Sequence, residues 1–163
     1  MTHHREVTTD AGEQSIGFTR EFEAPAARVF RAHTDPDQLG RWTGPRGTTL
    51  AMRAFDARTG GSWSYVISGP SGGWAFHGTF HEVTASSRLV QTFEFEGDPG
   101  HPSLEVLTFT DLADGRSRLE GLSVFLSAAD RDAMLGGMDS GMDENFRRLD
   151  ELIATDPATE PGA

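Results

Sequence analysis

The chain contains 163 residues, of which 36% are hydrophobic and 24% charged, and its 25 acidic residues outnumber its 14 basic ones to give a net charge of −11. This length suits one domain, and eleven Phe and three Trp supply enough apolar surface to exclude wholesale disorder. The absence of cysteine excludes disulfides, thiolate metal sites and thiol nucleophiles. The negative charge disfavours nucleic acid and anionic membranes as partners. No stretch is apolar for long enough to span a membrane and no apolar signal region follows Met1, so we expect a cytoplasmic protein.

The first elements expected are one strand and two short helices. Apolar residues mark a strand over 15–22, and the following Pro25 suits the first turn of a helix. Asp35 and Pro36 stop that helix, and Asp35 can cap a second short helix through Leu39 to Trp42.

The middle of the chain predicts an antiparallel meander. Short runs with a period of about two are separated by turn signals, such as Gly60-Gly61 and Asp114-Gly115, and no crossover helix intervenes. The expected strands cover 48–56, 62–68, 74–83, 88–96, 104–111 and 116–126.

The last part of the chain returns to a helical pattern. Asp130 and Asp132 open a segment for which we expect a break at Gly136-Gly137, before a long C-terminal helix. Residues 14–154 form the expected domain, with flexible tails at 1–13 and 155–163. The order of elements predicts an α+β protein in which a curved antiparallel sheet of about seven strands wraps around the C-terminal helix. The apolar stripe of that helix consists of Met138, Met142, Phe146, Leu149 and Ile153.

Local sequence motifs resemble a known family in the same order. The segment from Phe22 to Ala32, with Asp35-Pro36 and the run from Leu39 to Pro45, resembles the opening of the AHSA-type branch of the SRPBCC superfamily, the START/Bet v-like or polyketide cyclase-like proteins. Because most of these motifs are turn and core residues, they identify a fold better than a reaction. Further matches follow at Asp56–Gly61 with Trp63, Gly78–Val83, Arg88–Val90, Ser117–Leu119 and Gly141–Leu152.

The resemblance implies a helix-grip fold with an apolar cavity between the sheet and the last helix. Large apolar side chains on shared strand faces, and Met residues on the helix, suit such a lining, although each could equally fill the core. Trp42 could either close one end of the cavity or anchor its helix to the sheet. The candidate ligand-binding residues are Trp42, Trp63, Tyr65, Trp74, Phe76, His77, Phe93, Phe95, Met138, Met142 and Phe146.

The sequence contains no reactive motif. His77 and His81 would lie roughly 13 Å apart at about 3.3 Å per residue, too far to share a metal ion, so we expect neither a metal nor a cofactor. No GxSxG nucleophile elbow or phosphate-binding glycine motif is present. For acid–base chemistry, Tyr65, His77, Arg53 and Glu94 are conceivable groups, and we assign no catalytic residue.

Three hypotheses follow. The first is a non-catalytic protein that binds a small hydrophobic or aromatic molecule. The second is a cyclase- or aromatase-like tailoring enzyme, or a natural-product resistance protein, that uses the same cavity. The third is a co-chaperone or protein-interaction module, although we expect no chaperone partner because the chain lacks room for the additional domain of the full eukaryotic activator. Many relatives form dimers, so the resemblance allows a homodimer, but the sequence shows no exposed apolar strip for one.

Overall fold

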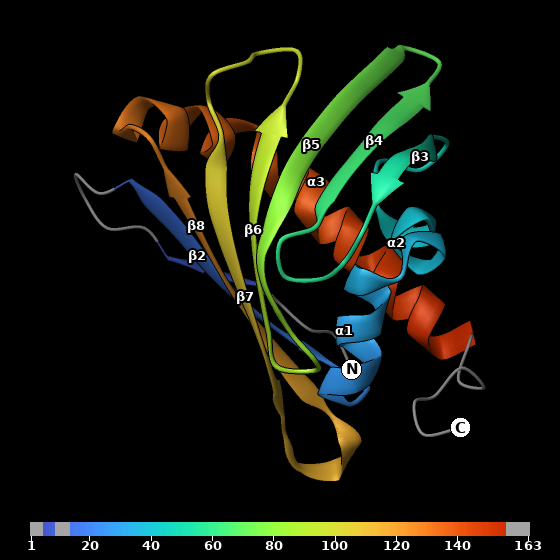
Figure 1. Ribbon diagram of the computed structural model, residues 1–163. Coiled ribbons are helices and arrows are strands. Elements are labelled where there is room, and N and C mark those ends of the chain that lie inside the picture. Colours follow the sequence, from blue (N-terminus) through green and yellow to red (C-terminus); the bar gives the residue numbers. More distant parts are fainter. Residues whose placement is uncertain (1–4, 9–13, 156–163) are drawn as a thin grey trace.

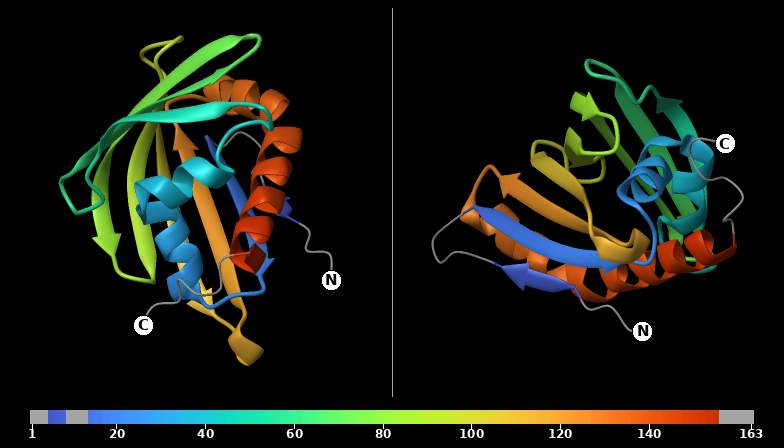
Figure 2. Two further views of the ribbon diagram at one scale, coloured as in Figure 1. Left: turned by 90° about the vertical axis from the view of Figure 1, so that its right-hand side faces the viewer. Right: turned by 90° about the horizontal axis from the view of Figure 1, so that it is seen from below.

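The computed structural model describes residues 5–8 and 14–155, except for the side chains of residues 137–140. One antiparallel sheet of eight strands, in the order β1-β2-β8-β7-β6-β5-β4-β3, curves around helix α3, with α1 and α2 on the same concave side (Figures 1 and 2). The strands are β1 (Glu6–Thr8), β2 (Ser15–Phe22), β3 (Thr49–Phe55), β4 (Ser62–Gly69), β5 (Gly72–Thr84), β6 (Arg88–Phe95), β7 (Ser103–Asp111) and β8 (Ser117–Phe125). The helices are α1 (Ala26–Thr34), α2 (Pro36–Trp42), the short 3-10 turn η1 (Ala113–Gly115) and α3 (Ala128–Thr155).

The predicted α+β class and meander are confirmed, with each predicted strand bound within two residues of the observed one. The helix pair also forms where expected, because the Asp35 carboxylate accepts hydrogen bonds from the backbone N–H groups of Asp37, at 2.9 Å, and Gln38, at 3.3 Å.

Two features differ from the sequence prediction. Residues Glu6–Thr8, placed in a flexible tail, pair with β2 as an edge strand that is too short to show a period of its own. The expected break at Gly136-Gly137 is absent, since α3 runs continuously from Ala128 to Thr155. A glycine inside a helix costs only about 1 kcal/mol relative to alanine, which the rest of a long helix can offset. The predicted C-terminal tail lies outside the described residues beyond Thr155.

Strand pairing decides which side chains face inward. Residues opposite one another in an antiparallel pair share a face, so Phe22 of β2 and its partner Ser117 of β8 lie on the concave side, as do Leu119 and Phe109 of neighbouring strands. Phe22, Leu119 and Phe109 pack with Leu149 of α3 in a deeply buried part of the core.

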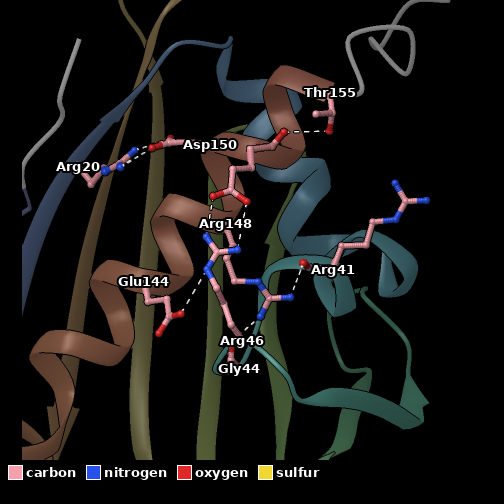
Figure 3. Close-up of polar contacts among 9 residues, drawn as sticks. Arg20, Arg41, Gly44, Arg46, Glu144, Arg148, Asp150 and Thr155 are labelled. Carbon is pink, nitrogen blue, oxygen red and sulfur yellow. Dashed lines mark hydrogen bonds and ion pairs between the residues drawn. The ribbon is translucent and has the colours of Figure 1, made fainter.

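Polar contacts fasten the C-terminal half of α3 to its surroundings (Figure 3). The Arg148 guanidinium donates hydrogen bonds to the carbonyl oxygens of Gly44 and Arg41, in and before the loop that follows α2. Arg20 of β2 binds both carboxylate oxygens of Asp150 at 2.7 Å. The backbone of α3 packs mainly against α2, β2 and β8.

Candidate functional site

Five aromatic side chains form a continuous array, called here the aromatic patch, on the concave face of β4 to β6. Trp63 lies 5.0 Å from Tyr65 and 5.7 Å from Phe93, measured between ring centroids. Phe76 lies 5.8 Å from Tyr65, 5.2 Å from Phe93 and 5.3 Å from Phe95. All five residues are among the predicted ligand-binding candidates, and the structure brings them together.

The strand register explains why these rings meet. Tyr65 pairs with Phe76, and Phe76 pairs with Phe95, so the three side chains emerge on one face. Trp63 pairs with Gly78, where a Cβ atom would lie 2.7 Å from the indole Nε1 and 1.9 Å from the Thr92 carbonyl oxygen. Glycine at 78 therefore leaves the space that the Trp63 indole occupies.

The aromatic patch is buried at one side and partly open at the other. Trp63 is 3% exposed and Tyr65 8%, whereas Phe76, Phe93 and Phe95 are half-buried. Neither the Trp63 indole N–H nor the Tyr65 hydroxyl has a hydrogen-bond partner among the described residues. The aromatic patch thus contains two polar groups that form no hydrogen bond with the described residues.

Two polar residues that sequence reasoning missed lie on the same concave face. Gln91 of β6 pairs with Glu105 of β7, and its Nε2 donates a hydrogen bond of 2.9 Å to Glu105 Oε1. Burial raises the pKa of Glu105, although the Gln91 hydrogen bond opposes this. Burial, and then the negative charge of Glu105, raise the pKa of Tyr65. The signal in the sequence was the period of two that joins Glu105 to Leu107 and Phe109.

His77, predicted as a ligand-binding residue and considered as one conceivable acid–base group, lies on the other face of the sheet. His77 pairs with Glu94 of β6, one position away from the inward pair Phe76 and Phe95. Its Nε2 lies 3.0 Å from a Glu94 carboxylate oxygen and its Nδ1 lies 2.8 Å from Glu96, which also forms an ion pair with Arg53 at 2.6 Å. His77, Arg53 and Glu94 therefore belong to a convex polar cluster and do not join the aromatic patch.

Trp42 and Phe146 belong to a second group of rings around α3. The Trp42 indole donates a hydrogen bond of 2.9 Å to the Ala32 carbonyl oxygen, and its ring stacks on Phe146 with 6.3 Å between centroids. Phe146 also contacts Phe18 and Phe22 of β2, at 5.5 and 5.7 Å. These contacts favour the anchoring role for Trp42 over the gating role.

The remaining candidates are divided between the two groups. Trp74 is half-buried on the concave face, opposite Ile67 of β4. Met142 is half-buried against the core, and the side chain of Met138 lies outside the described residues. Among the side chains that the structure describes, no cluster of three metal-binding groups occurs. Over residues 5–8 and 14–155, no helix combines the length and hydropathy that a membrane crossing requires.

Apolar side chains are also exposed on the convex face, contrary to the sequence expectation. Leu104 of β7 pairs with Val124 of β8, and Val106 pairs with Leu122. Leu104, Leu122 and Val124 are each about two-fifths exposed. This convex strip is the feature on which an interaction with another protein would be sought.

Comparison with protein families gives a match over most of the chain. The family model described as "Activator of Hsp90 ATPase homolog 1-like protein" matches residues 23–154. The chain belongs to this family. The predicted AHSA-type membership, within the SRPBCC helix-grip superfamily, is thereby confirmed. No curated protein matches the chain.

Solved structures share the AHSA-type fold over nearly their full length. A protein from Mycobacterium smegmatis is 26% identical, with a TM-score of 0.82 over 93% of this chain and 97% of that chain. One from Arthrobacter aurescens is also 26% identical, with a TM-score of 0.82 over 92% and 91%. One from Rhodobacter sphaeroides is 23% identical, with a TM-score of 0.84 over 93% and 99%. These likenesses establish the fold, and function has to be argued from the site residues.

Proposed function

We propose that this AHSA-type protein binds a small hydrophobic or aromatic molecule between the concave face of its sheet and α3. The observation that carries the proposal is the aromatic patch, in which three of five rings are half-buried on an inward face. Among the described residues, the rings of the patch contact one another and none contacts Phe146 of α3. An apolar ligand would cover the faces and edges that these rings leave exposed.

The chemistry of the patch suits a ligand with a flat apolar body. Rings packed at 5 to 6 Å offer offset-stacked and edge-to-face contacts to a further ring. Met142, half-buried on α3, adds an adaptable thioether side chain to the helix side. Ligand sites of this kind are mostly apolar with a few polar groups that fix orientation, here Tyr65, Gln91 and Glu105.

The test is thermal unfolding in the presence of aromatic polyketides, flavonoids, sterols and fatty acids. A ligand at 100 times its dissociation constant stabilises the folded state by about 2.7 kcal/mol, which raises Tm by about 5–10 °C for a chain of this size. We expect at least one aromatic or apolar class to give such a shift.

A pair of variants locates the site. Phe93→Ala removes a ring of the aromatic patch and should weaken binding about tenfold or more, whereas Val106→Ala, half-buried on the convex face, should leave affinity unchanged. Affinity is read as the dissociation constant, which separates it from the loss of stability that either truncation causes. No shift with any class, or equal affinities in Phe93→Ala and wild type, would contradict the proposal.

Catalysis of the cyclase or aromatase type is the second candidate. It is favoured by the presence of Tyr65 and Glu105 on one concave face, where a hydroxyl could polarise a carbonyl and a carboxylate could accept a proton. Mass spectrometry of an incubated aromatic polyketide decides between the candidates. A new product that forms with wild type but not with Tyr65→Phe would support catalysis, and an unchanged bound compound supports binding alone.

A further inference from the structure

Glu105 is a carboxylate in an unusual place. It stands on the concave face of β7, opposite Gln91 of β6 and Ser123 of β8, in the same alternating set as Leu107 and Phe109. Among residues 5–8 and 14–155, no arginine or histidine forms an ion pair with it. Its one hydrogen bond within that part of the chain comes from Gln91, so the second carboxylate oxygen accepts none there.

An unpaired carboxylate in this position costs stability. Burial of a charged group without a counter-charge is unfavourable, and here the burial is strong enough to raise the pKa of Glu105. Yet the residue as a whole is only half-buried. Glu105 therefore combines protein surroundings with surface that a ligand can reach.

We propose that Glu105 is the polar anchor of the ligand site, and that the ligand carries a protonated amine, or another hydrogen-bond donor, on its apolar body. This inference rests on the proposed function and specifies the class of ligand. Gln91 holds one carboxylate oxygen and leaves the other for the ligand. A charge-assisted hydrogen bond at such a site is among the strongest polar contacts available.

Among the described residues, the concave face of the sheet offers an anionic ligand no cation next to Glu105. Arg20 also points inward, but both terminal nitrogens of its guanidinium are bound by Asp150 and the group lies over the Phe22 ring, 4.6 Å from its centroid. A fatty acid or other carboxylate would therefore meet Glu105 without a compensating positive charge. The site selects by charge as well as by shape.

Three naphthalenes with the same ring system and with cationic, neutral and anionic 1-substituents test this selection. They are 1-naphthylmethylamine, which is protonated at neutral pH, 1-methylnaphthalene, and the carboxylate 1-naphthaleneacetate. Calorimetric titration of the full chain should show that the amine binds about tenfold or more tightly than 1-methylnaphthalene, and the acetate most weakly of the three.

Two variants with the same change of net charge identify the residue responsible. In Glu105→Gln, the preference for the amine should disappear while the affinity for 1-methylnaphthalene stays within about threefold of wild type. Glu120→Gln, on the exposed convex face of β8, should behave as wild type because Glu120 points away from the site. Ligand-free Glu105→Gln should also unfold at a higher temperature than wild type, whereas a purely structural role for Glu105 predicts a lower one.

The outcomes separate the two proposals. If 1-methylnaphthalene binds but the amine binds no more tightly, or keeps its advantage in Glu105→Gln, the anchor role of Glu105 is overturned and the ligand-binding function stands. If none of the three naphthalenes binds, the proposed apolar ligand site fails, and the anchor role fails with it.

Discussion

His33 shows how a single buried side chain can report on the core. Its Nδ1–H donates a hydrogen bond of 2.8 Å to the Val29 carbonyl oxygen, and its ring lies against Trp42 and Phe109 at 4.8 and 5.3 Å between centroids. Burial lowers the pKa of His33 to about 4, so the imidazole is neutral in the folded protein at physiological pH.

Stability should therefore fall as the medium becomes acidic. The unfolded chain binds a proton at His33 near pH 6.5 and the folded chain near pH 4, so the unfolded state gains protons first and the contribution is lost as pH falls through this window. We expect wild type to lose about 2 kcal/mol more than His33→Phe between pH 7 and pH 5. Chemical denaturation at the two pH values measures the difference, and parallel losses in both proteins would show that His33 is not the group responsible.

Helix α3 is held to the rest of the fold by several polar contacts, although the glycines in its sequence lower its intrinsic helix propensity. In its C-terminal half, Arg148 binds the Arg41 carbonyl oxygen and Asp150 binds Arg20. Its more N-terminal turns contain Gly136 and Gly141, which have low helix propensity, but the helix is continuous through both. A Cβ atom at either glycine would meet no heavy atom within 4 Å. Neither glycine is therefore needed for close packing.

Alanine at these positions should stabilise the protein. Gly136→Ala and Gly141→Ala remove backbone entropy from the unfolded chain, and each should add about 0.5–1 kcal/mol, seen as a higher Tm. Gly78→Ala is the matched contrast, because its Cβ atom would lie 1.9 Å from the Thr92 carbonyl oxygen, and it should lower Tm. A lower Tm for Gly136→Ala would indicate that the helix is broken there in solution.

The sequence predicted the positions of helices and strands better than it predicted which side chains face the concave side of the sheet. Periodicity placed the strands, because alternation is a local property, and it also grouped Trp63 with Tyr65 correctly. Which polar residue points inward depends on register across three strands. His77, next to Phe76, was therefore a plausible ligand-binding residue, but its side chain lies on the convex face. Glu105 was overlooked because its sequence neighbours Leu104 and Val106 lie on the convex face, whereas Glu105 lies on the concave one.

At the scale of the whole molecule, the net charge of −11 and the position of Glu105 act together. The surplus of carboxylates creates a negative electrostatic potential that attracts cations toward the protein. Dissolved salt weakens this attraction beyond the Debye length, which is about 8 Å at physiological ionic strength. The field thus favours the same class of ligand as the concave face does.

The rate at which a cationic ligand associates with the protein should depend on this negative electrostatic potential. Stopped-flow measurements should show that 1-naphthylmethylamine associates severalfold more slowly when salt is raised from low to high concentration, while 1-methylnaphthalene is unaffected. The rate should respond similarly to salt in Glu105→Gln, since one charge in eleven changes the overall field little. An equal salt response for both compounds would contradict steering by the protein's charge.

The sheet is open rather than closed, with β1 and β3 at its two edges. The unpaired backbone N–H and C=O groups of an edge strand can pair with a strand of another chain. Both edges of this sheet have features that disfavour such pairing. β1 is only three residues long. On the opposite side, the register of β3 shifts between Met52 and Ala54, at a charged arginine, and α2 packs beside the strand. The curvature that places the aromatic patch on an inward face is thereby combined with protection against edge-to-edge aggregation.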